Sequence, residues 1–401
     1  MRRIIVVNPH RIWYLKSTAD FYSRKHPVPV KYDWIFNRFL EQNCVAVVSG
    51  GRTLSPFAGL FRILNLNSID FTVWKRINGV KLPQVMSLEN CTDEDVIFFF
   101  SYGNIHYSSF RKDLISHELR AAIKKSAAQK IAHVSHFCYS SVEMLSGLKE
   151  MGVNSVIADA PIDVSSRLYE RACQRANHRP VVHVLPFRPH SRFYQEPSSS
   201  IRINKIALTG SIATCQDPLF LDTYGSPFLQ PLRATLAETA LKYPLYFDSF
   251  LSTVSSQSID PPKNAVIRTI NDLTAIARIL VRPKGGGQRR LPYMSNQNNA
   301  VYSRYVAFLN GEEVDEHPSV GFVEGMASGC VLIASDSQAY RDLGMKDGVH
   351  FLQHDGTIGG IIDKFSFYLR RPRYMKKISQ AGRSLIINIK YDSILERILS
   401  K

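Results

Sequence analysis

The stretch Glu316-His-Pro-Ser-Val-Gly-Phe-Val-Glu324, continued by Gly-Met-Ala-Ser-Gly-Cys-Val-Leu-Ile-Ala-Ser335, is the part of this chain that decides its fold. It follows the apolar run Tyr305–Leu309 and ends in the apolar run Val331–Ala334. Each run has the length and composition of a buried strand. The Pro-Ser pair between them is typical of the start of a helix. We therefore expect one βαβ unit over residues 305–334.

The two glutamates and the helix start between them favour an anionic ligand that also carries hydroxyl groups. The first backbone N–H groups of this helix, at residues 320–322, are expected to point at the anion. Glu324, expected in the second turn, can accept hydrogen bonds from two vicinal hydroxyls of a ribose, and Glu316 can reach a transferred sugar from the loop. The pattern predicts a nucleotide-sugar site, although two solvated glutamates on an ordinary helix have the same spacing.

The same string resembles the C-terminal signature of glycosyltransferase family 4 and its GT-B relatives. In those enzymes two glutamates separated by seven residues precede a Met-Ala-Ser-Gly-like segment, as Glu316 and Glu324 precede residues 326–329 here. Gly325 and the small residues of that segment are expected to let the helix pack close to its sheet. The resemblance implies an α/β fold of the GT-B type, in which two Rossmann-like domains with parallel sheets face each other across a cleft.

A chain of 401 residues suits two domains of ordinary size. In the N-terminal half, apolar strand candidates alternate with helical patterns, which favours a mostly parallel sheet covered by helices. Residues 181–193 resemble the domain junction of the family, and a new strand is expected at 205–210. The resemblance implies an acceptor-binding domain at 1–190, a nucleotide-sugar-binding domain at 204–375 and a helix at 376–401 that crosses back to the first domain.

Hydrophobic patterns place the other elements. Besides the two strands of the βαβ unit, strands are expected at 4–7, 45–48, 96–100, 131–134, 155–157, 181–185 and 205–210. Helices are expected at 32–41, 113–125, 141–151, 229–242, 271–280, 358–369, 374–387 and 391–399. No Gly-x-Gly-x-x-Gly follows the first strand, so a dinucleotide-dependent dehydrogenase is disfavoured.

The resemblance implies a hexosyltransferase that moves a sugar from a nucleotide-sugar donor to a glycan, lipid-linked or other hydroxyl acceptor. The implied setting is the synthesis of bacterial-type surface polysaccharides or glycoconjugates. The implied outcome is retention, with the departing phosphate oxygen as base and Glu316 orienting the sugar. Inverting GT-B enzymes use similar arrangements, but they need an Asp, Glu or His base from the N-terminal half, and none stands out.

Several further residues follow from the resemblance. Family 4 enzymes often have a histidine on the N-terminal side of the cleft, which points to His136 as a second catalytic residue, although a lone histidine is more often structural. From their position in the loop after the strand expected at 96–100, Tyr102, Asn104 and His106 are expected to contact the acceptor. Donor contacts are expected from Glu324, Ser319, Val320, Gly321, Phe322, Gly210 and Ser211.

The cations that hold the donor diphosphate are missing from their usual place. In much of family 4 they follow the first strand of the C-terminal domain, where they offset the charge of the leaving group. Here residues 209–215 read Thr-Gly-Ser-Ile-Ala-Thr-Cys and contain neither Lys nor Arg. Residues 282–290 offer cations and three consecutive glycines instead. We therefore predict that Lys284 and Arg290 hold the diphosphate, with a solvated surface loop as the alternative.

A formal Asp-x-Asp motif occurs at Asp93-Glu-Asp95. It precedes the strand expected at 96–100, whereas a metal site in an α/β sheet lies past the carboxyl end of a strand. We interpret it as a charged turn. Neither a metal ion nor another cofactor is expected for the reaction.

The charge is unevenly distributed. The net charge is +16, and residues 1–190 carry +10 of it, from 25 Lys and Arg against 15 Asp and Glu. Such a field attracts anionic lipid headgroups, a diphosphate-linked acceptor or nucleic acid, and no nucleic-acid motif accompanies it. The basic amphipathic pattern at 109–130 is either the solvated face of a domain helix or a membrane-surface contact.

The six cysteines show neither the spacing of a disulfide framework nor that of a zinc finger. No apolar run is long enough to cross a bilayer, and the first is followed by no cleavage site. A cytoplasmic protein, in peripheral contact with the inner face of the membrane at most, is expected. Two other function classes stay open, namely a sugar-nucleotide epimerase of GT-B architecture and a non-catalytic protein that binds nucleotide sugars or glycans.

Overall fold

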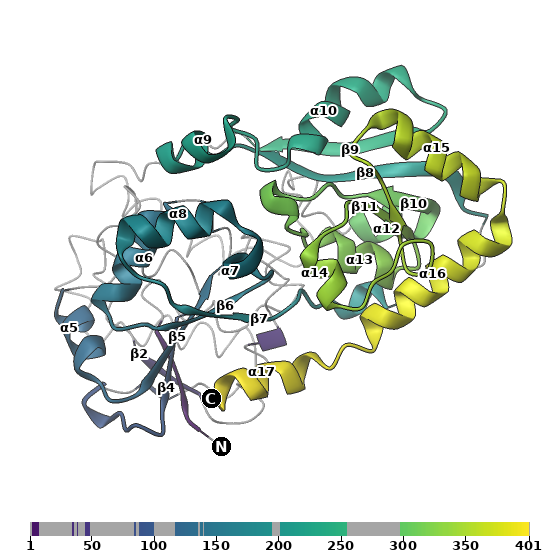
Figure 1. Cartoon of the computed structure of the whole chain (residues 1–401). Coiled ribbons are helices and arrows are strands. Elements are labelled where there is room, and N and C mark those ends of the chain that lie inside the picture. The colour runs from purple at the N-terminus through teal and green to yellow at the C-terminus, as the bar shows by residue number, and fades with distance from the viewer. Residues whose placement is uncertain are drawn as a thin grey trace, which may run out of the picture.

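The computed structural model (Figure 1) describes residues 2–7, 34–35, 38, 45–48, 84–85, 88–99, 117–134, 137–138, 140–194, 201–254 and 297–400. The described strands form two parallel sheets. We call the described residues up to 194 the N-terminal lobe and the described residues of 201–387 the C-terminal lobe. The domain boundaries at 190, 204 and 375 stay predictions.

The N-terminal lobe contains a seven-stranded sheet in the order β3-β2-β1-β4-β5-β6-β7. This is the strand order of a Rossmann fold with one strand more. The described part of β4 is buried throughout, as expected of a parallel sheet covered on both faces. The strands are β1 (Ile4–Val7), β2 (Val45–Val48), β3 (Gln84–Val85), β4 (Val96–Phe99), β5 (Gln129–Val134), β6 (Ser155–Ala158) and β7 (Val181–Val184).

The described helices of this lobe include α8, whose sequence period places Leu168, Tyr169, Ala172, Cys173 and Ala176 on its buried face. Ser166 caps it by accepting a hydrogen bond from the Tyr169 N–H at 3.2 Å. The helices are α5 (His117–Lys125), α6 (Ser141–Glu150), α7 (Ile162–Ser165) and α8 (Arg167–Ala176), with short 3-10 turns at Leu88–Asn90 and Ser191–Phe193.

The C-terminal lobe contains a five-stranded sheet in the order β12-β11-β10-β8-β9. Its strands are β8 (Ile203–Ala213), β9 (Phe247–Val254), β10 (Tyr305–Leu309), β11 (Val331–Ala334) and β12 (Leu352–Gln353). Its helices are α9 (Pro218–Tyr224), α10 (Pro231–Thr239), α12 (Gln297–Arg304), α13 (Gly321–Ala327), α14 (Gln338–Asp342), α15 (Ile358–Leu369) and α16 (Pro372–Ile387), with 3-10 turns at Ala240–Lys242 and Val314–Glu316.

The predicted βαβ unit is confirmed. β10 and β11 are parallel neighbours, and α13 connects them. Gly325 of α13 lies against the ring of Phe308 in β10, and a Cβ at this position would come within 2.3 Å of Phe308 Cζ. Only a glycine allows the helix this close approach to the sheet. The helix differs from the prediction in its start, because it begins at Gly321 and places Glu324 in its first turn.

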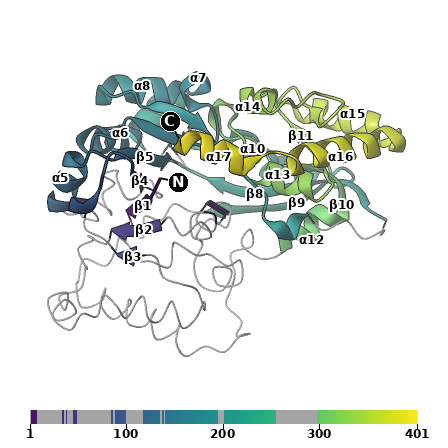
Figure 2. The same cartoon turned by 90° about the horizontal axis from the view of Figure 1, so that it is seen from below.

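The last helix, α17 (Tyr391–Leu399), leaves the C-terminal lobe and packs on the N-terminal lobe. Figure 2 shows α16 and α17 following one another across both lobes. The Tyr391 and Trp34 rings lie 6.0 Å apart, and Leu395 and Ile398 share one buried cluster with Ile4 of β1 and residues of the C-terminal lobe. One hydrophobic core therefore extends from the N-terminal lobe through the junction into the C-terminal lobe.

A second connection between the lobes is made by α9, which belongs to the C-terminal lobe by sequence but lies over α8 (Figure 1). Leu219 and Phe220 of α9 share a buried cluster with Leu168 and Ala172 of α8. Arg171 of α8 also forms an ion pair with Asp222 at the end of α9. No helix within the described residues is long and apolar enough to cross a membrane.

Candidate active site

The strand order of the C-terminal sheet defines where a ligand is expected to bind. β8 and β10 are neighbours, and the chain continues from β8 to β9 on one side and from β10 to β11 on the other. In open α/β sheets, ligands bind at such a switch point, outside the carboxyl ends of the two strands. Gly210 and Ser211 of β8, and Asn310 directly after β10, lie at this edge.

A buried arginine lies at this edge of the sheet. Arg233 of α10 is 3% exposed. Its guanidinium donates to the Asn310 carbonyl, to the Ser211 carbonyl at 2.7 Å and to the Ser319 hydroxyl at 2.5 Å. Burial lowers the pKa of Arg233, but an arginine stays protonated in proteins. A fixed positive charge therefore lies at the carboxyl ends of β8 and β10.

Two glycines make room for this side chain. Gly210 has a φ of +114° and Gly311 a φ of +55°. A Cβ at Gly210 would lie 2.6 Å from Arg233 Cζ, and one at Gly311 would lie 2.8 Å from Arg233 Cγ. Gly210 was predicted to contact the nucleotide-sugar donor. Its lack of a side chain leaves the space that the Arg233 guanidinium occupies.

Ser319 is held by two donors. Its hydroxyl accepts from Arg233 and from the Asn310 amide, and it therefore does not cap α13 as the sequence suggested. Its carbonyl accepts from the Phe322 N–H at 3.1 Å, so the predicted exposure of that N–H to a ligand is wrong. Because both lone pairs of the Ser319 oxygen are used, its own O–H is left to donate.

Glu324 lies behind Ser319 in the first turn of α13 and is half-buried. Burial and the Glu324 charge raise the pKa of Tyr302. The Tyr302 hydroxyl lies 3.1 Å from Thr209 Oγ1, which donates to Asn310 Oδ1 at 3.4 Å. A hydrogen-bonded series thus runs from Tyr302, whose pKa responds to the Glu324 charge, through Thr209 and Asn310 to Ser319 at the sheet edge.

Glu316 lies in the loop between β10 and α13, with its side chain exposed. Both Asp315 and Glu316 have left-handed backbone conformations, with φ of 58° and 59°. Partial desolvation raises the pKa of Glu316, and the charges of Glu312 and Asp336 raise it further, against the opposing effect of Arg341. The Glu316 carboxylate therefore lies near the carboxylates of Glu312 and Asp336.

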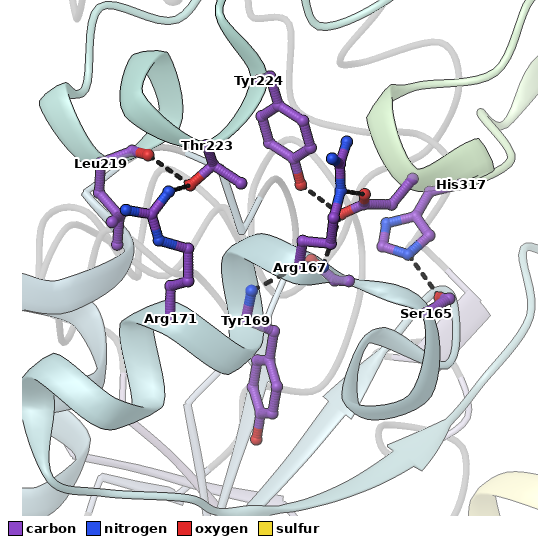
Figure 3. Close-up of polar contacts among 10 residues, drawn as sticks. Ser165, Arg167, Tyr169, Arg171, Leu219, Thr223, Tyr224 and His317 are labelled. Atoms are coloured by element: carbon purple, nitrogen blue, oxygen red, sulfur yellow. Dashed lines mark hydrogen bonds and ion pairs between the residues drawn. The ribbon is translucent and has the colours of Figure 1, made fainter.

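The residues on both sides of Glu316 bind the N-terminal lobe (Figure 3). The Asp315 carboxylate accepts from the Arg167 N–H at 3.0 Å, from Arg167 Nε at 3.3 Å and from the Tyr224 hydroxyl of α9. His317 Nε2 lies 2.8 Å from Ser165 Oγ. The loop that carries Glu316 is thereby attached to α7, α8 and α9.

Several predicted site residues lie outside the described residues, namely His136, Tyr102, Asn104, His106, Lys284 and Arg290. Among the predicted residues that the structure describes, Ser211 and Ser319 are joined through Arg233 at the edge of the C-terminal sheet, next to Gly210. Glu316, Val320, Gly321, Phe322 and Glu324 lie in the segment that leads from β10 into α13.

The Asp-x-Asp motif has a structural role. Asp95 is 3% exposed and accepts from Arg3 Nη2 at 2.7 Å and from the Thr92 N–H at 2.7 Å. These bonds lower the pKa of Asp95 against the effect of its burial. Residues 93–94 form the turn that was expected. Within the described ranges, no group of three or more His, Cys, Asp or Glu side chains is arranged to hold a metal ion.

Sequence reasoning missed Arg233 and Asn310. Arg233 follows the start of an unremarkable amphipathic helix, 23 positions after Gly210, and Asn310 is a polar residue after a strand. The two glycines that accommodate Arg233 can be found in the sequence. Their contact with Arg233 could not be predicted, because α10 meets them only in the folded protein.

No protein-family model and no curated protein sequence matches this chain. Solved structures, in contrast, are similar to this chain. HepE of Anabaena in complex with UDP superposes with a TM-score of 0.51 and 13% identity, over 99% of this chain and 98% of HepE. The fold is GT-B.

Two further solved structures are similar to this chain. HepE of Anabaena in complex with UDP-glucose gives a TM-score of 0.50 and 11% identity over 100% of this chain and 99% of HepE. TarM of S. aureus gives a TM-score of 0.45 and 12% identity over 77% of this chain. The chain spans about half of TarM, 55% of its length. The predicted GT-B fold, with two Rossmann-like lobes, is confirmed by the comparison with HepE.

Proposed function

We propose that this chain transfers a sugar from a nucleotide-sugar donor to a hydroxyl acceptor and binds the donor at the β8 and β10 edge. The observation that carries the proposal is the position of the two glutamates. Glu316 and Glu324 lie on either side of Ser319 in the segment that leaves β10 at the switch point of a GT-B sheet. Ligands of open α/β sheets bind at this place.

Each side chain has a role that its surroundings support. Glu324 accepts hydrogen bonds from the ribose hydroxyls, and the free O–H of Ser319 donates to a diphosphate oxygen. Arg233 donates to the Ser319 hydroxyl and is buried, so its charge stabilises the diphosphate across protein of low dielectric constant. Arg233 thus supplies a cation that residues 209–215 lack. Lys284 and Arg290 remain proposed as outer contacts to the diphosphate.

The proposed reaction needs no metal ion and retains the anomeric configuration. The bond between the anomeric carbon and the phosphate oxygen breaks, and its electron pair stays on the phosphate. The acceptor oxygen forms the new bond to that carbon and gives its proton to the departing phosphate oxygen. Glu316 accepts hydrogen bonds from sugar hydroxyls and holds the sugar for attack from the same face. His136 is proposed to contact the reacting groups, and Tyr102, Asn104 and His106 the acceptor.

HepE, which shares the fold, was crystallised with UDP and with UDP-glucose. This makes UDP-sugars the first donor class to test, ahead of GDP-, dTDP- and CMP-sugars. A role in surface polysaccharide or glycoconjugate synthesis in the cytoplasm, with a glycan or lipid-linked acceptor, is part of the proposal.

The test separates binding from transfer. Calorimetry against the donor panel is expected to find one nucleotide sugar that binds. Glu324→Gln is expected to weaken nucleotide binding about tenfold, because one charge-assisted contact is lost. Glu316→Gln is expected to lower kcat while nucleotide affinity stays within twofold. Glu238→Gln, on the exposed side of α10, is the matched control.

Three results would contradict the proposal or redirect it. Failure of every nucleotide sugar to bind would exclude it. Transfer by a Glu316→Gln and Glu324→Gln double variant at the parent rate would exclude the site. An isomerised donor formed without any acceptor would indicate the epimerase, and binding without turnover of either kind would indicate the non-catalytic alternative.

We also propose peripheral contact with an anionic membrane, but through a different surface from the one the sequence suggested. α5 is packed into the lobe through Leu119 and Ile123, and Arg120 is paired with Glu150 at 3.8 Å. The end of α15 and the start of α16 instead expose the aromatic rings of Phe367 and Tyr374 among cations. The exposed cations are Arg370, Arg371, Arg373, Lys376 and Lys377.

Aromatic rings among cations favour the interface of an anionic bilayer, where each cation contributes about 1 kcal/mol. Replacing Arg370 and Arg373 by serine is expected to reduce sedimentation with phosphatidylglycerol vesicles at least tenfold. The matched control replaces Lys124 and Lys125, which are exposed at the end of α5. Equal binding by both variants, or equal binding to neutral phosphatidylcholine vesicles, would exclude this surface.

A further inference from the structure

The loop residues on both sides of Glu316 contact the other lobe, and this arrangement has a consequence for the sugar site. Asp315 is 4% exposed at its side chain, whereas its partner Arg167 is 69% exposed. Asp315 therefore lies inside the interface between the lobes. We define this set of contacts, made by Asp315 and His317 with Ser165, Arg167 and Tyr224, as the interlobe latch.

The Asp315 carboxylate meets the start of a ten-residue helix. Arg167 is the first residue of α8, and its backbone N–H donates to Asp315 Oδ2. A carboxylate at this place gains from the positive end of the helix as well as from the hydrogen bond. The side chains of Arg167 and Tyr224, which both bind Asp315, also contact each other, because the Arg167 guanidinium lies 4.9 Å from the centre of the Tyr224 ring.

The contact of His317 has a defined direction. The Ser165 hydroxyl donates to the Pro161 carbonyl at 2.9 Å and has no second hydrogen to give. His317 Nε2 must therefore carry the proton and donate it to Ser165 Oγ across 2.8 Å. Burial lowers the pKa of His317, which favours this neutral form. The latch thus needs no charged histidine.

The backbone between the two contacts is unusual. Asp315 and Glu316 are consecutive left-handed residues, and neither is a glycine. An aspartate tolerates this conformation, whereas a glutamate in it costs on the order of 1–3 kcal/mol. Such a conformation persists only where the surroundings hold it, and here the holding contacts come from the N-terminal lobe and α9.

We propose that Asp315 is a positioning residue that places Glu316 for sugar binding only while the N-terminal lobe is docked on the loop. This inference rests on the proposed function of Glu316. Orientation of the donor sugar is thereby coupled to the approach of the lobe that holds the acceptor. When the lobes separate, the left-handed pair loses its support, and Glu316 leaves the position from which it contacts the sugar.

The experiment uses the full chain and the variant Asp315→Asn, which keeps the shape but removes the charge. We expect kcat to fall about 10- to 100-fold, because a misplacement of about 1 Å costs on this order. The Kd for the nucleotide is expected to stay within twofold, since Glu324 and Ser319 are unchanged. Asp363→Asn, an exposed aspartate of α15, is the matched control. Tyr224→Phe is expected to give a smaller loss that is not additive with Asp315→Asn.

A second measurement needs no turnover. Amide hydrogen exchange is expected to rise at least fivefold at residues 314–317 and at the start of α8 in Asp315→Asn, and not in Asp363→Asn. Unchanged exchange, or unchanged kcat in an active enzyme, would overturn the inference. An equal loss of nucleotide affinity and kcat would overturn it as well, because it would show a general structural defect. If exchange rises as expected but the parent chain binds no nucleotide sugar, the proposed function fails and the latch stands.

Discussion

Among the individual residues, Arg233 shows best how this site is built. Its guanidinium contacts two carbonyls and a hydroxyl at the edge of the sheet, and two glycines leave the space for it. A buried cation of this kind is tolerated because each bond goes to an oxygen and because the charges of Glu312 and Glu313 oppose the effect of burial. The carboxylates of Glu312 and Glu313 therefore help to keep Arg233 charged.

Glu312 provides a test at the residue scale. Its charge raises the pKa of Glu316, and its Oε1 accepts from the Tyr340 hydroxyl at 2.9 Å. Glu312→Gln keeps that bond and removes the charge, so the pKa of Glu316 is expected to fall. If Glu316 acts as a carboxylate, the acid limb of kcat against pH is expected to move to lower pH. Asp336→Asn should shift it in the same direction, and a limb that stays or moves upward would contradict the role of Glu316.

The raised pKa of Glu316 also makes the stability of the folded state depend on pH. Because the folded pKa of Glu316 lies above the ordinary value of 4.5, the folded state binds the proton more tightly than the unfolded state. The stabilisation by this group is fully present below pH 4.5 and is lost as pH rises through the folded pKa. Glu316 is thus a site where function is retained at some cost in stability.

At the scale of elements, the contact of α13 with β10 decides how close a ligand can come to the backbone. Gly325 faces the ring of Phe308, which is fully buried. Gly321 faces the Asn310 side chain in the same way, with a hypothetical Cβ 2.3 Å from Oδ1. At these two positions α13 therefore lies closer to the end of β10 than a residue with a Cβ would allow.

Two glycine replacements test this packing. Gly325→Ala is expected to lower the free energy of unfolding by about 1–3 kcal/mol, because the added methyl group overlaps the Phe308 ring. Gly359→Ala in α15 is the matched control, since nothing lies within 4 Å of its Cβ, and it should raise stability by about 0.5–1 kcal/mol. Urea unfolding measures both, and equal effects of the two replacements would contradict the close packing.

At the scale of the whole molecule, the lobes are connected at two places. α17 packs on the N-terminal lobe, where Arg38 pairs with Glu396 at 2.6 Å and Arg188 with Asp392 at 3.2 Å. α9 and the interlobe latch form the other connection. Both lie between segments far apart in the chain, so the relation of donor and acceptor surfaces depends on long-range contacts.

The connection through α17 predicts an effect at a distance in sequence. Leu395→Ala is expected to lower the free energy of unfolding by about 2–4 kcal/mol, because Leu395 is 1% exposed in the shared core. All three tryptophans precede residue 75, so tryptophan fluorescence during urea unfolding reports the N-terminal half. The half-buried Leu399 is the control, and its replacement should cost less. An unchanged fluorescence transition in Leu395→Ala would show that α17 does not stabilise that half.

Much of the fold was predictable because its signals are local. Strands β1, β2, β10 and β11 and helices α15 and α17 were expected at the residues where they occur. Hydrophobic periodicity reports these elements directly. Strands β3 and β12 were missed because two residues are too short to form a pattern, and β9 because its polar residues interrupt the apolar ones.

The sequence by itself determined the βαβ unit, the spacing of Glu316 and Glu324 and the small residues of α13, because these depend on neighbours along the chain. Only the tertiary structure decided that Arg233 reaches Ser319 and that Asp315 binds Arg167, 148 positions away. Such contacts depend on strand order and lobe packing, which no local pattern encodes. The left-handed backbone of Glu316 has the same origin, since contacts of Asp315 and His317 with the N-terminal lobe and α9 hold this segment against its own preference.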